Sequence, residues 1–209
     1  NAGYFEQFAL EKSAAIFSQN DQLVMVGGTG LYIKSFCEGI DPMPQIDPSV
    51  REAIIDNYTS KGLIWLQAEL KHRDPAFWET AEQANPQRLM RALEVLNATG
   101  KSILQFRTAQ KKQRPFNIVK IGLEMPMDQL TLRINSRVDQ MMLDGLIKEV
   151  QSVVQFRTKP ALQTVGYKEI FDFLDGKISK ETAIQQIKHH TRQYAKRQMT
   201  WFKKDPEFK

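Results

Sequence analysis

A glycine-rich turn directly after a short apolar run constrains the fold of this chain more than any other feature. Residues 23–25 are apolar, and Gly27, Gly28, Thr29 and Gly30 follow almost at once. Because glycines lack side chains, the backbone N–H groups of such a turn approach an anion closely and lead into a helix. The pattern predicts a buried strand, a phosphate-facing turn and a helix. An ordinary tight connection between strand and helix has the same composition.

Helical periodicity and capping signals dominate most of the first hundred residues on either side of this turn. Residues 4–17 place apolar side chains on one face and predict an amphipathic helix. Asp47, followed by a proline, predicts the start of a helix that ends near Gly62. Asn85, also followed by a proline, predicts a second helix that ends at Gly100. From residue 43 onward this part of the chain is therefore predicted to be helical, without a convincing strand.

Strand character returns once, and helices follow it to the end of the chain. Residues 116–123 are rich in branched apolar side chains and predict a strand that returns to the sheet. Further helices are predicted over residues 127–143, 146–155, 165–174 and 180–203. We interpret the fold as α/β and predominantly helical. Its core is formed by residues 1–42 and 114–209, and residues 43–113 form an all-helical insertion.

Composition favours a polyanionic partner and excludes cysteine chemistry. The chain has 209 residues, 42% of them hydrophobic, and a formal charge of +5, which suits a polyanion without requiring one. Cys37 is the only cysteine, so neither an internal disulfide nor a cysteine metal site is expected, and a reducing cytoplasm fits. No apolar run approaches the length of a membrane span. We expect a soluble, cytoplasmic protein without a membrane partner.

The last predicted helix carries cations on one side. They recur at four-residue and seven-residue spacings and predict a basic ridge along the surface: Lys188, Arg192, Lys196 and Lys203. Apolar and aromatic positions recur on another side, which we expect to be largely buried: Ile184, Ile187, Thr191, Tyr194 and Trp201. A cationic ridge on a rigid helix neutralises a nucleic-acid backbone. A plain solvated face is the alternative.

Two further pairs of arginines are candidates for anion binding. Arg88 and Arg91 lie at the start of a helix, where cations oppose the helix dipole. A pair between Arg91 and Glu94, three residues later, is the alternative to an anion contact. Arg133 and Arg137 are one helical turn apart and could hold a diphosphate together. For them, the alternative is surface pairing with Glu124 or Asp144.

The order and spacing of these motifs resemble the tRNA dimethylallyltransferase family over essentially the whole chain. The resemblance implies a P-loop NTPase-like core and prenyl transfer from dimethylallyl diphosphate to the exocyclic amine of the adenosine 3′-adjacent to the anticodon. It implies that Thr29 is catalytic and that Gly27, Gly28, Gly30, Arg133 and Arg137 bind the diphosphate. It further implies Mg²⁺ on the diphosphate, no metal ligand within this chain and a monomeric complete enzyme.

The resemblance also implies which residues bind the tRNA anticodon stem-loop. They fall in three segments: Gln87, Arg88, Leu89, Met90 and Arg91; Gln163, Thr164, Val165, Gly166, Tyr167 and Lys168; and Arg192, Lys196, Arg197, Gln198, Met199, Thr200, Trp201, Phe202 and Lys203. The middle segment is implied to form the pocket for the adenine. Read without the family, it is a helix entry with core packing at Val165 and Tyr167.

Two elements of the family pattern are absent from these 209 residues. No Gly-x-x-x-x-Gly-Lys-Ser/Thr sequence occurs, because the Gly-Lys-Ser triplet at residues 100–102 lacks the first glycine of that pattern; the phosphate-binding loop of the family is therefore missing, and with it the carboxylate that serves as general base. We therefore expect this chain alone to be inactive, to expose a sheet edge and to self-associate. A non-catalytic RNA-binding module and a relative of the adenylate isopentenyltransferases are the alternative functions.

Overall fold

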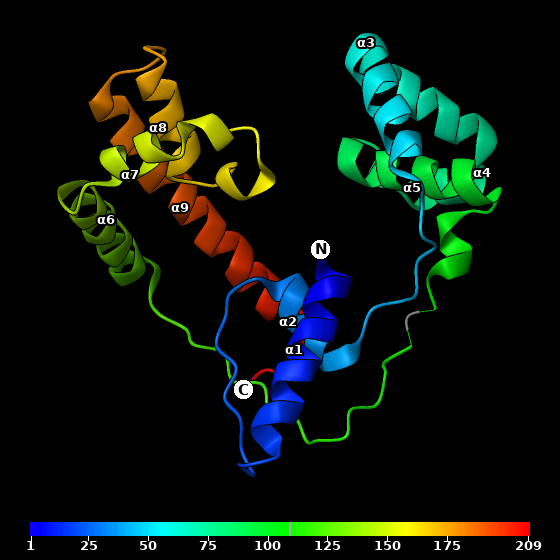
Figure 1. The fold of residues 1–209 in the computed structure, drawn as a ribbon, viewed down its shortest axis with the longest axis horizontal. Coiled ribbons are helices and arrows are strands. Elements are labelled where there is room, and N and C mark those ends of the chain that lie inside the picture. Colours follow the sequence, from blue (N-terminus) through cyan, green and yellow to red (C-terminus); the bar gives the residue numbers. More distant parts are fainter. Residues whose placement is uncertain (109) are drawn as a thin grey trace. The chain divides into compact units, whose positions relative to one another are not determined.

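The protein, described here as a computed structural model of residues 1–108 and 110–209, is predominantly helical (Figure 1). Ala109, within the predicted insertion, lies outside the described residues. The described helices are α1 (Ala2–Phe17), α2 (Gly30–Glu38), α3 (Pro48–Arg73), α4 (Pro75–Thr80), α5 (Pro86–Thr99), α6 (Met127–Leu143), α7 (Leu146–Ser152), α8 (Tyr167–Leu174) and α9 (Lys180–Phe202). Short 3-10 helices are η1 (Ile103–Phe106), η2 (Val154–Phe156) and η3 (Pro160–Leu162).

The chain divides into two compact units. One comprises residues 1–23 and 34–115, and the other residues 24–33 and 116–209. The glycine-rich segment therefore belongs to the same unit as α6 to α9. The three-part organisation drawn from the sequence stays a prediction.

Local capping signals start α3 and α5 and end α5 as predicted, but the predicted end of a helix near Gly62 is wrong. The Asp47 carboxylate accepts a hydrogen bond from the Ser49 N–H at the start of α3. Asn85 accepts from the Arg88 N–H at the start of α5, and Gly100 ends α5 in the left-handed conformation. Gly62 breaks the helical backbone with φ 72°, but a second helical stretch continues beyond it to Arg73.

The helices α3, α4 and α5 enclose an apolar core, and Figure 1 shows these helices together. Its fully buried members include Leu66 and Leu70 of α3 and Leu89 and Leu93 of α5. Burying a leucine stabilises a fold by about 1.5–3 kcal/mol. This core therefore explains why α3 and α5 pack along one another.

The core of the second unit lies between α6, α7, α8 and α9. Val138, Val150, Ile170 and Ile187 are almost completely buried there, one from each helix. Val138 lies one turn from Ile134, which is also buried, so α6 presents one apolar face to its neighbours. This face fixes the rotation of α6 and thereby the direction of its polar side chains.

The predicted strands are wrong. Residues 23–25 and 116–123 are not strands, and an isolated parallel bridge between Lys120 and Phe208 is the nearest approach to a sheet in the described part of the chain. A strand requires hydrogen bonds to a neighbour, which branched side chains do not supply. Val24, Val26, Val119, Ile121 and Leu123 are instead exposed. The α/β class is not observed, and the P-loop NTPase-like core stays a prediction.

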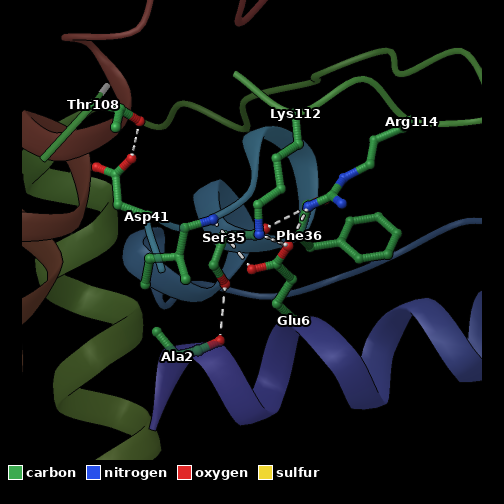
Figure 2. Close-up of polar contacts among 9 residues, drawn as sticks. Ala2, Glu6, Ser35, Phe36, Asp41, Thr108, Lys112 and Arg114 are labelled. Carbon is green, nitrogen blue, oxygen red and sulfur yellow. Dashed lines mark hydrogen bonds and ion pairs between the residues drawn. The ribbon is translucent and has the colours of Figure 1, made fainter. Parts of the chain in front are cut away.

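A buried carboxylate joins segments of the first unit that are far apart in sequence (Figure 2). Glu6 of α1 accepts from Arg114 Nη2 at 2.9 Å, from Lys112 Nζ at 3.1 Å and from the Ile40 N–H at 3.1 Å. Arg114 Nε also donates to the Phe36 carbonyl at 2.8 Å. Burial raises the pKa of Glu6, but hydrogen bonds from Arg114 and Lys112 outweigh burial and hold that pKa below its usual value. Because this pKa is lowered in the folded protein, the Glu6 carboxylate contributes to folding stability above the ordinary glutamate pKa. That contribution is lost as pH falls through the pKa of Glu6 in the folded state.

Candidate functional site

The glycine-rich segment lies directly against the end of α9. Gln198 Nε2 donates to the Gly28 carbonyl at 2.7 Å. A Cβ on Gly28 would lie 2.2 Å from that nitrogen, and a Cβ on Gly30 would lie 2.2 Å from the indole ring of Trp201. Gly27 differs, because its Cβ would meet only Ile33 at 3.8 Å. Close approach of α9 therefore explains the glycines at 28 and 30, a constraint that the sequence alone does not reveal.

Thr29 presents a free hydroxyl at the start of α2. Its carbonyl accepts from the N–H groups of Tyr32 and Ile33 at 2.9 and 3.1 Å, which begins the helix at Gly30. The residue is exposed, and its hydroxyl has no hydrogen-bond partner in the described part of the chain. Chemically, such a hydroxyl at a helix N-terminus is suited to donate to an anion.

The α6 arginines are exposed and unpaired. Neither Arg133 nor Arg137 forms an ion pair or a side-chain hydrogen bond with any described residue. The carboxylates that the sequence offered as alternative partners are bound elsewhere. Glu124 pairs with Lys203, and Asp144 accepts from Gln140 at 2.7 Å. Both guanidinium groups therefore keep all their donors available for a ligand.

Two of the cations predicted to form a surface ridge on α9 instead contact polar side chains of α6. Arg192 Nη1 donates to Asn135 Oδ1 at 2.9 Å, and Lys188 Nζ pairs with Asp139 Oδ1 at 2.6 Å. Only 13% of the Lys188 side chain is exposed. The predicted four-cation ridge is therefore wrong at Lys188, because Asp139, distant in sequence, draws this lysine into the helix interface.

An aromatic and basic surface replaces that ridge at the end of α9. Lys196 and Arg197 are exposed, and the Arg197 guanidinium lies 5.9 Å from the ring centroid of Tyr194. Tyr194 and Trp201, which the periodicity placed on a largely buried side, are 42% and 43% exposed. That expectation is wrong for both rings. Exposed aromatic rings beside cations can stack on bases while the cations bind phosphates.

The predicted tRNA-contact segment at the start of α5 mixes buried and exposed side chains. Leu89 and Met90 belong to the apolar core, whereas Gln87 and Arg88 are exposed. Arg91 Nη1 donates to Glu94 Oε2 at 3.1 Å, so the ion pair left open by the sequence is present. These placements leave Gln87, Arg88 and part of Arg91 accessible from outside the core.

Residues 163–166 form a turn before α8, and residues 167 and 168 begin that helix. Gly166 has φ 102°, a conformation that favours glycine, and its N–H donates to buried Glu169 at 2.7 Å. Tyr167 donates its hydroxyl to Glu149, and this hydrogen bond raises the tyrosine pKa. Thr164, Val165 and Lys168 are exposed. Gln163 Nε2 donates to the Arg157 carbonyl.

Three residues that support this turn were not predicted from the sequence: Glu149, Glu169 and His190. Glu169 also binds His190 Nδ1 of α9 at 2.5 Å, so one buried carboxylate joins the turn to α9. A glutamate three positions after a helix-opening glycine is a recognisable capping signal. Nothing local to Glu149 or His190 indicates either contact.

The sequence of this chain matches one protein family over almost its whole length. The family described as IPP transferase matches residues 1–205. The chain belongs to the IPP transferase family. It is 45% identical over 209 residues to the tRNA dimethylallyltransferase of Cytophaga hutchinsonii, covering 100% of this chain and 69% of that protein. It is 44% identical to tRNA dimethylallyltransferase 1 of Bacteroides thetaiotaomicron, covering 100% and 68%.

Solved IPP transferase structures share the fold. The full-length tRNA isopentenylpyrophosphate transferase of Bacillus halodurans aligns with TM-score 0.64 and 33% identity, covering 100% of this chain and 65% of that chain. A eukaryotic dimethylallyltransferase acting on tRNA aligns with TM-score 0.72 at 24% identity, which concerns the fold alone. The chain thus spans about two thirds of the length of the bacterial relatives and 52% of the eukaryotic chain. No helix of the described residues is long and apolar enough to cross a membrane.

Proposed function

We propose that the protein carrying residues 1–209 transfers a dimethylallyl group from dimethylallyl diphosphate to the exocyclic amine of the adenosine 3′-adjacent to the anticodon of tRNA. The observation that carries the proposal is the glycine-rich segment, held against α9 by Gln198 with the Thr29 hydroxyl free beside it. Membership of the IPP transferase family supports the reaction class. A cytoplasmic monomer is the corresponding expectation.

Thr29 is the residue to which we assign a catalytic role. The amine nitrogen forms a bond to the prenyl carbon while the bond from that carbon to the diphosphate oxygen breaks, and the diphosphate leaves. Negative charge grows on the bridging oxygen, and a hydroxyl donor stabilises that charge by a few kcal/mol, roughly 2.7–4. Arg133 and Arg137, together with the backbone of Gly27, Gly28 and Gly30, hold the diphosphate. We assign the base that accepts the amine proton to no residue of this chain.

The surface around the end of α9 suits an RNA loop. Lys196 and Arg197 would neutralise phosphates, and Tyr194 and Trp201 offer exposed rings for stacking. The adenine must leave its stack before its amine reaches the prenyl carbon, at a cost of a few kcal/mol. Contacts from the segments 87–91, 163–168 and 196–203 would offset that cost.

Mg²⁺ is expected to accompany the diphosphate, but the candidate residues do not fit it as ligands. Thr29, Arg133, Arg137 and the glycine backbone are donors and cations, whereas Mg²⁺ prefers carboxylate and phosphate oxygens. We therefore assign the ion no ligand in this chain and no step.

Substitution of Thr29 tests the assignment. In the product of the full reading frame, Thr29→Ala should lower turnover about 100-fold with little change in tRNA affinity, because one transition-state donor is lost. Thr29→Ser, which keeps a hydroxyl, is the matched control and should retain most activity. Unchanged turnover of Thr29→Ala would end the assignment.

Two assays test the substrate and the active unit. Prenyl transfer should occur to an anticodon stem-loop RNA but not to AMP; transfer to AMP alone would identify an adenylate prenyltransferase, and RNA binding without transfer a binding module. Residues 1–209 by themselves should bind the RNA without transferring the prenyl group, because no complete Gly-x-x-x-x-Gly-Lys-Ser/Thr sequence occurs in them. Full activity of this chain alone would contradict that expectation.

A further inference from the structure

A buried carboxylate joins two arginines from different helices of the first unit. Only 3% of the Glu94 side chain is exposed. Its Oε2 accepts from Arg91 Nη1 at 3.1 Å, within α5, and its Oε1 pairs with Arg51 Nη1 of α3, also at 3.1 Å. Arg51 lies near the start of α3, far in sequence from α5. The two guanidinium groups therefore lie on either side of one carboxylate.

Most donors of both arginines remain available. Each guanidinium contacts Glu94 through Nη1 alone, although it carries five N–H donors. The side chains of Arg51 and Arg91 are 53% and 39% exposed, and neither has another charged partner among the described residues. The cluster keeps one net positive charge. Arg51 and Arg91, each held by the buried Glu94 carboxylate, thus present their remaining N–H donors to the solvent.

We propose that Arg51 is a phosphate-binding residue for the RNA substrate, acting beside Arg91, and that Glu94 positions both guanidinium groups. The ligand is an RNA phosphodiester, which planar guanidinium groups bind through paired donors. This inference rests on the proposed function, because Arg91 belongs to the segment 87–91 assigned there to tRNA. It extends that surface from α5 onto α3.

A carboxylate between two RNA-binding arginines can hold their side chains in place before the RNA binds. A free arginine loses considerable side-chain freedom when it binds, and an arginine already held by Glu94 loses less. Glu94 itself lowers the local positive charge. Removal of the Glu94 charge should therefore weaken RNA binding if positioning of the arginines matters more, and strengthen it if the added net charge matters more.

The experiment compares two matched arginines of α3. Arg51→Gln removes the charge but keeps an amide that donates to Glu94. Arg73→Gln is the control, because Arg73 lies at the other end of α3 and similarly contacts one carboxylate, Glu69, at 3.3 Å. Binding of a synthetic anticodon stem-loop RNA to the product of the full reading frame is measured across a salt series. Circular dichroism confirms that each variant is folded.

Arg51→Gln should weaken binding about tenfold at roughly 50 mM salt and reduce the slope of log K against log salt by about 0.7 to 0.9, the value for one phosphate contact. Arg73→Gln should leave that slope unchanged. Equal slopes for Arg51→Gln and the unsubstituted protein would overturn the proposal. If Arg51→Gln is unfolded, Arg51→Lys serves instead: it keeps the charge and loses the planar fork, and unchanged affinity would likewise overturn the proposal.

Glu94→Gln tests positioning by the sign of its effect. Added net charge alone would tighten RNA binding, whereas loss of positioning should weaken it about threefold. Tighter binding would overturn the role of Glu94. Lys196→Ala separates this inference from the proposed function. If the unsubstituted protein binds no RNA, or Lys196→Ala has no effect, the proposed function fails; if Lys196→Ala weakens binding and Arg51→Gln does not, only this inference fails.

Discussion

The arginines of α5 and of α6 were both inferred from spacing, yet the structure treats them differently. Arg88 and Arg91 contact carboxylates, Glu82 at 2.9 Å and Glu94 at 3.1 Å. Arg133 and Arg137 contact no carboxylate in the described residues. An arginine with a partner contributes to stability and offers its remaining donors. An unpaired arginine offers all its donors and contributes no ion pair to stability. The difference separates arginines with donors already used by a carboxylate from arginines with all donors available.

The largest effect is expected at the unpaired arginines. Arg133→Ala should raise the KM for dimethylallyl diphosphate about 10- to 100-fold, because one charge-assisted hydrogen bond contributes about 1.5–3 kcal/mol. Its unfolding midpoint in urea should barely move. Steady-state kinetics with Arg137→Ala as the parallel variant should show the smaller change at Arg137. A large loss of stability in Arg133→Ala would remove the distinction between the two helices.

A smaller effect on stability is expected at the paired arginines. Glu94→Gln should lower the free energy of unfolding by about 1–3 kcal/mol, since it weakens a buried acceptor shared by two arginines. Glu82→Gln is the matched control: Glu82 and Arg88 are both 60% exposed, and exposed pairs contribute about 0–1 kcal/mol. Urea denaturation of both variants measures the difference. Equal losses would show that burial of Glu94 is irrelevant.

The next effect should be at the contact between α6 and α9. Asp139→Asn leaves the amino group of Lys188, largely buried, with a neutral acceptor and should cost about 1 kcal/mol of stability. Because this contact lies on the same helix as Arg133, the KM for the prenyl donor should rise severalfold as well. Thermal unfolding and kinetics together measure both. A loss of stability without any change in KM would show that the contact does not position Arg133.

The smallest effect concerns the two close glycines. Gly30→Ala brings a Cβ to 2.2 Å from the Trp201 ring, whereas Gly27→Ala meets only Ile33 at 3.8 Å. Because Trp201 is partly exposed and can move, Gly30→Ala should cost less than about 1 kcal/mol, below the roughly 1–3 kcal/mol for overpacking in a closed core. Fluorescence of the tryptophans should change with Gly30→Ala and not with Gly27→Ala. Identical spectra for the two variants would contradict the close approach of α9.

Part of the candidate site could be predicted from local sequence and part could not. Thr29 at a helix start follows from the glycines around it, and the pair between Arg91 and Glu94 follows from their three-residue spacing. The contacts of Gln198 with Gly28 and of Arg51 with Glu94 join residues far apart in sequence, and no periodicity indicates them. Branched residues were likewise insufficient to predict strands, because strands exist only with partners.

The sequence by itself determined where α3 and α5 begin and where α5 ends. Asp47, Asn85 and Gly100 act on backbone groups within a few residues, so their effect does not depend on the rest of the fold. Tertiary structure alone decided which cations are available. Asp139 takes Lys188 into an interface, whereas Arg133 keeps its donors free. The reason is physical: a hydrogen bond to a helix end is local, whereas burial and ion pairing depend on which distant segments pack together.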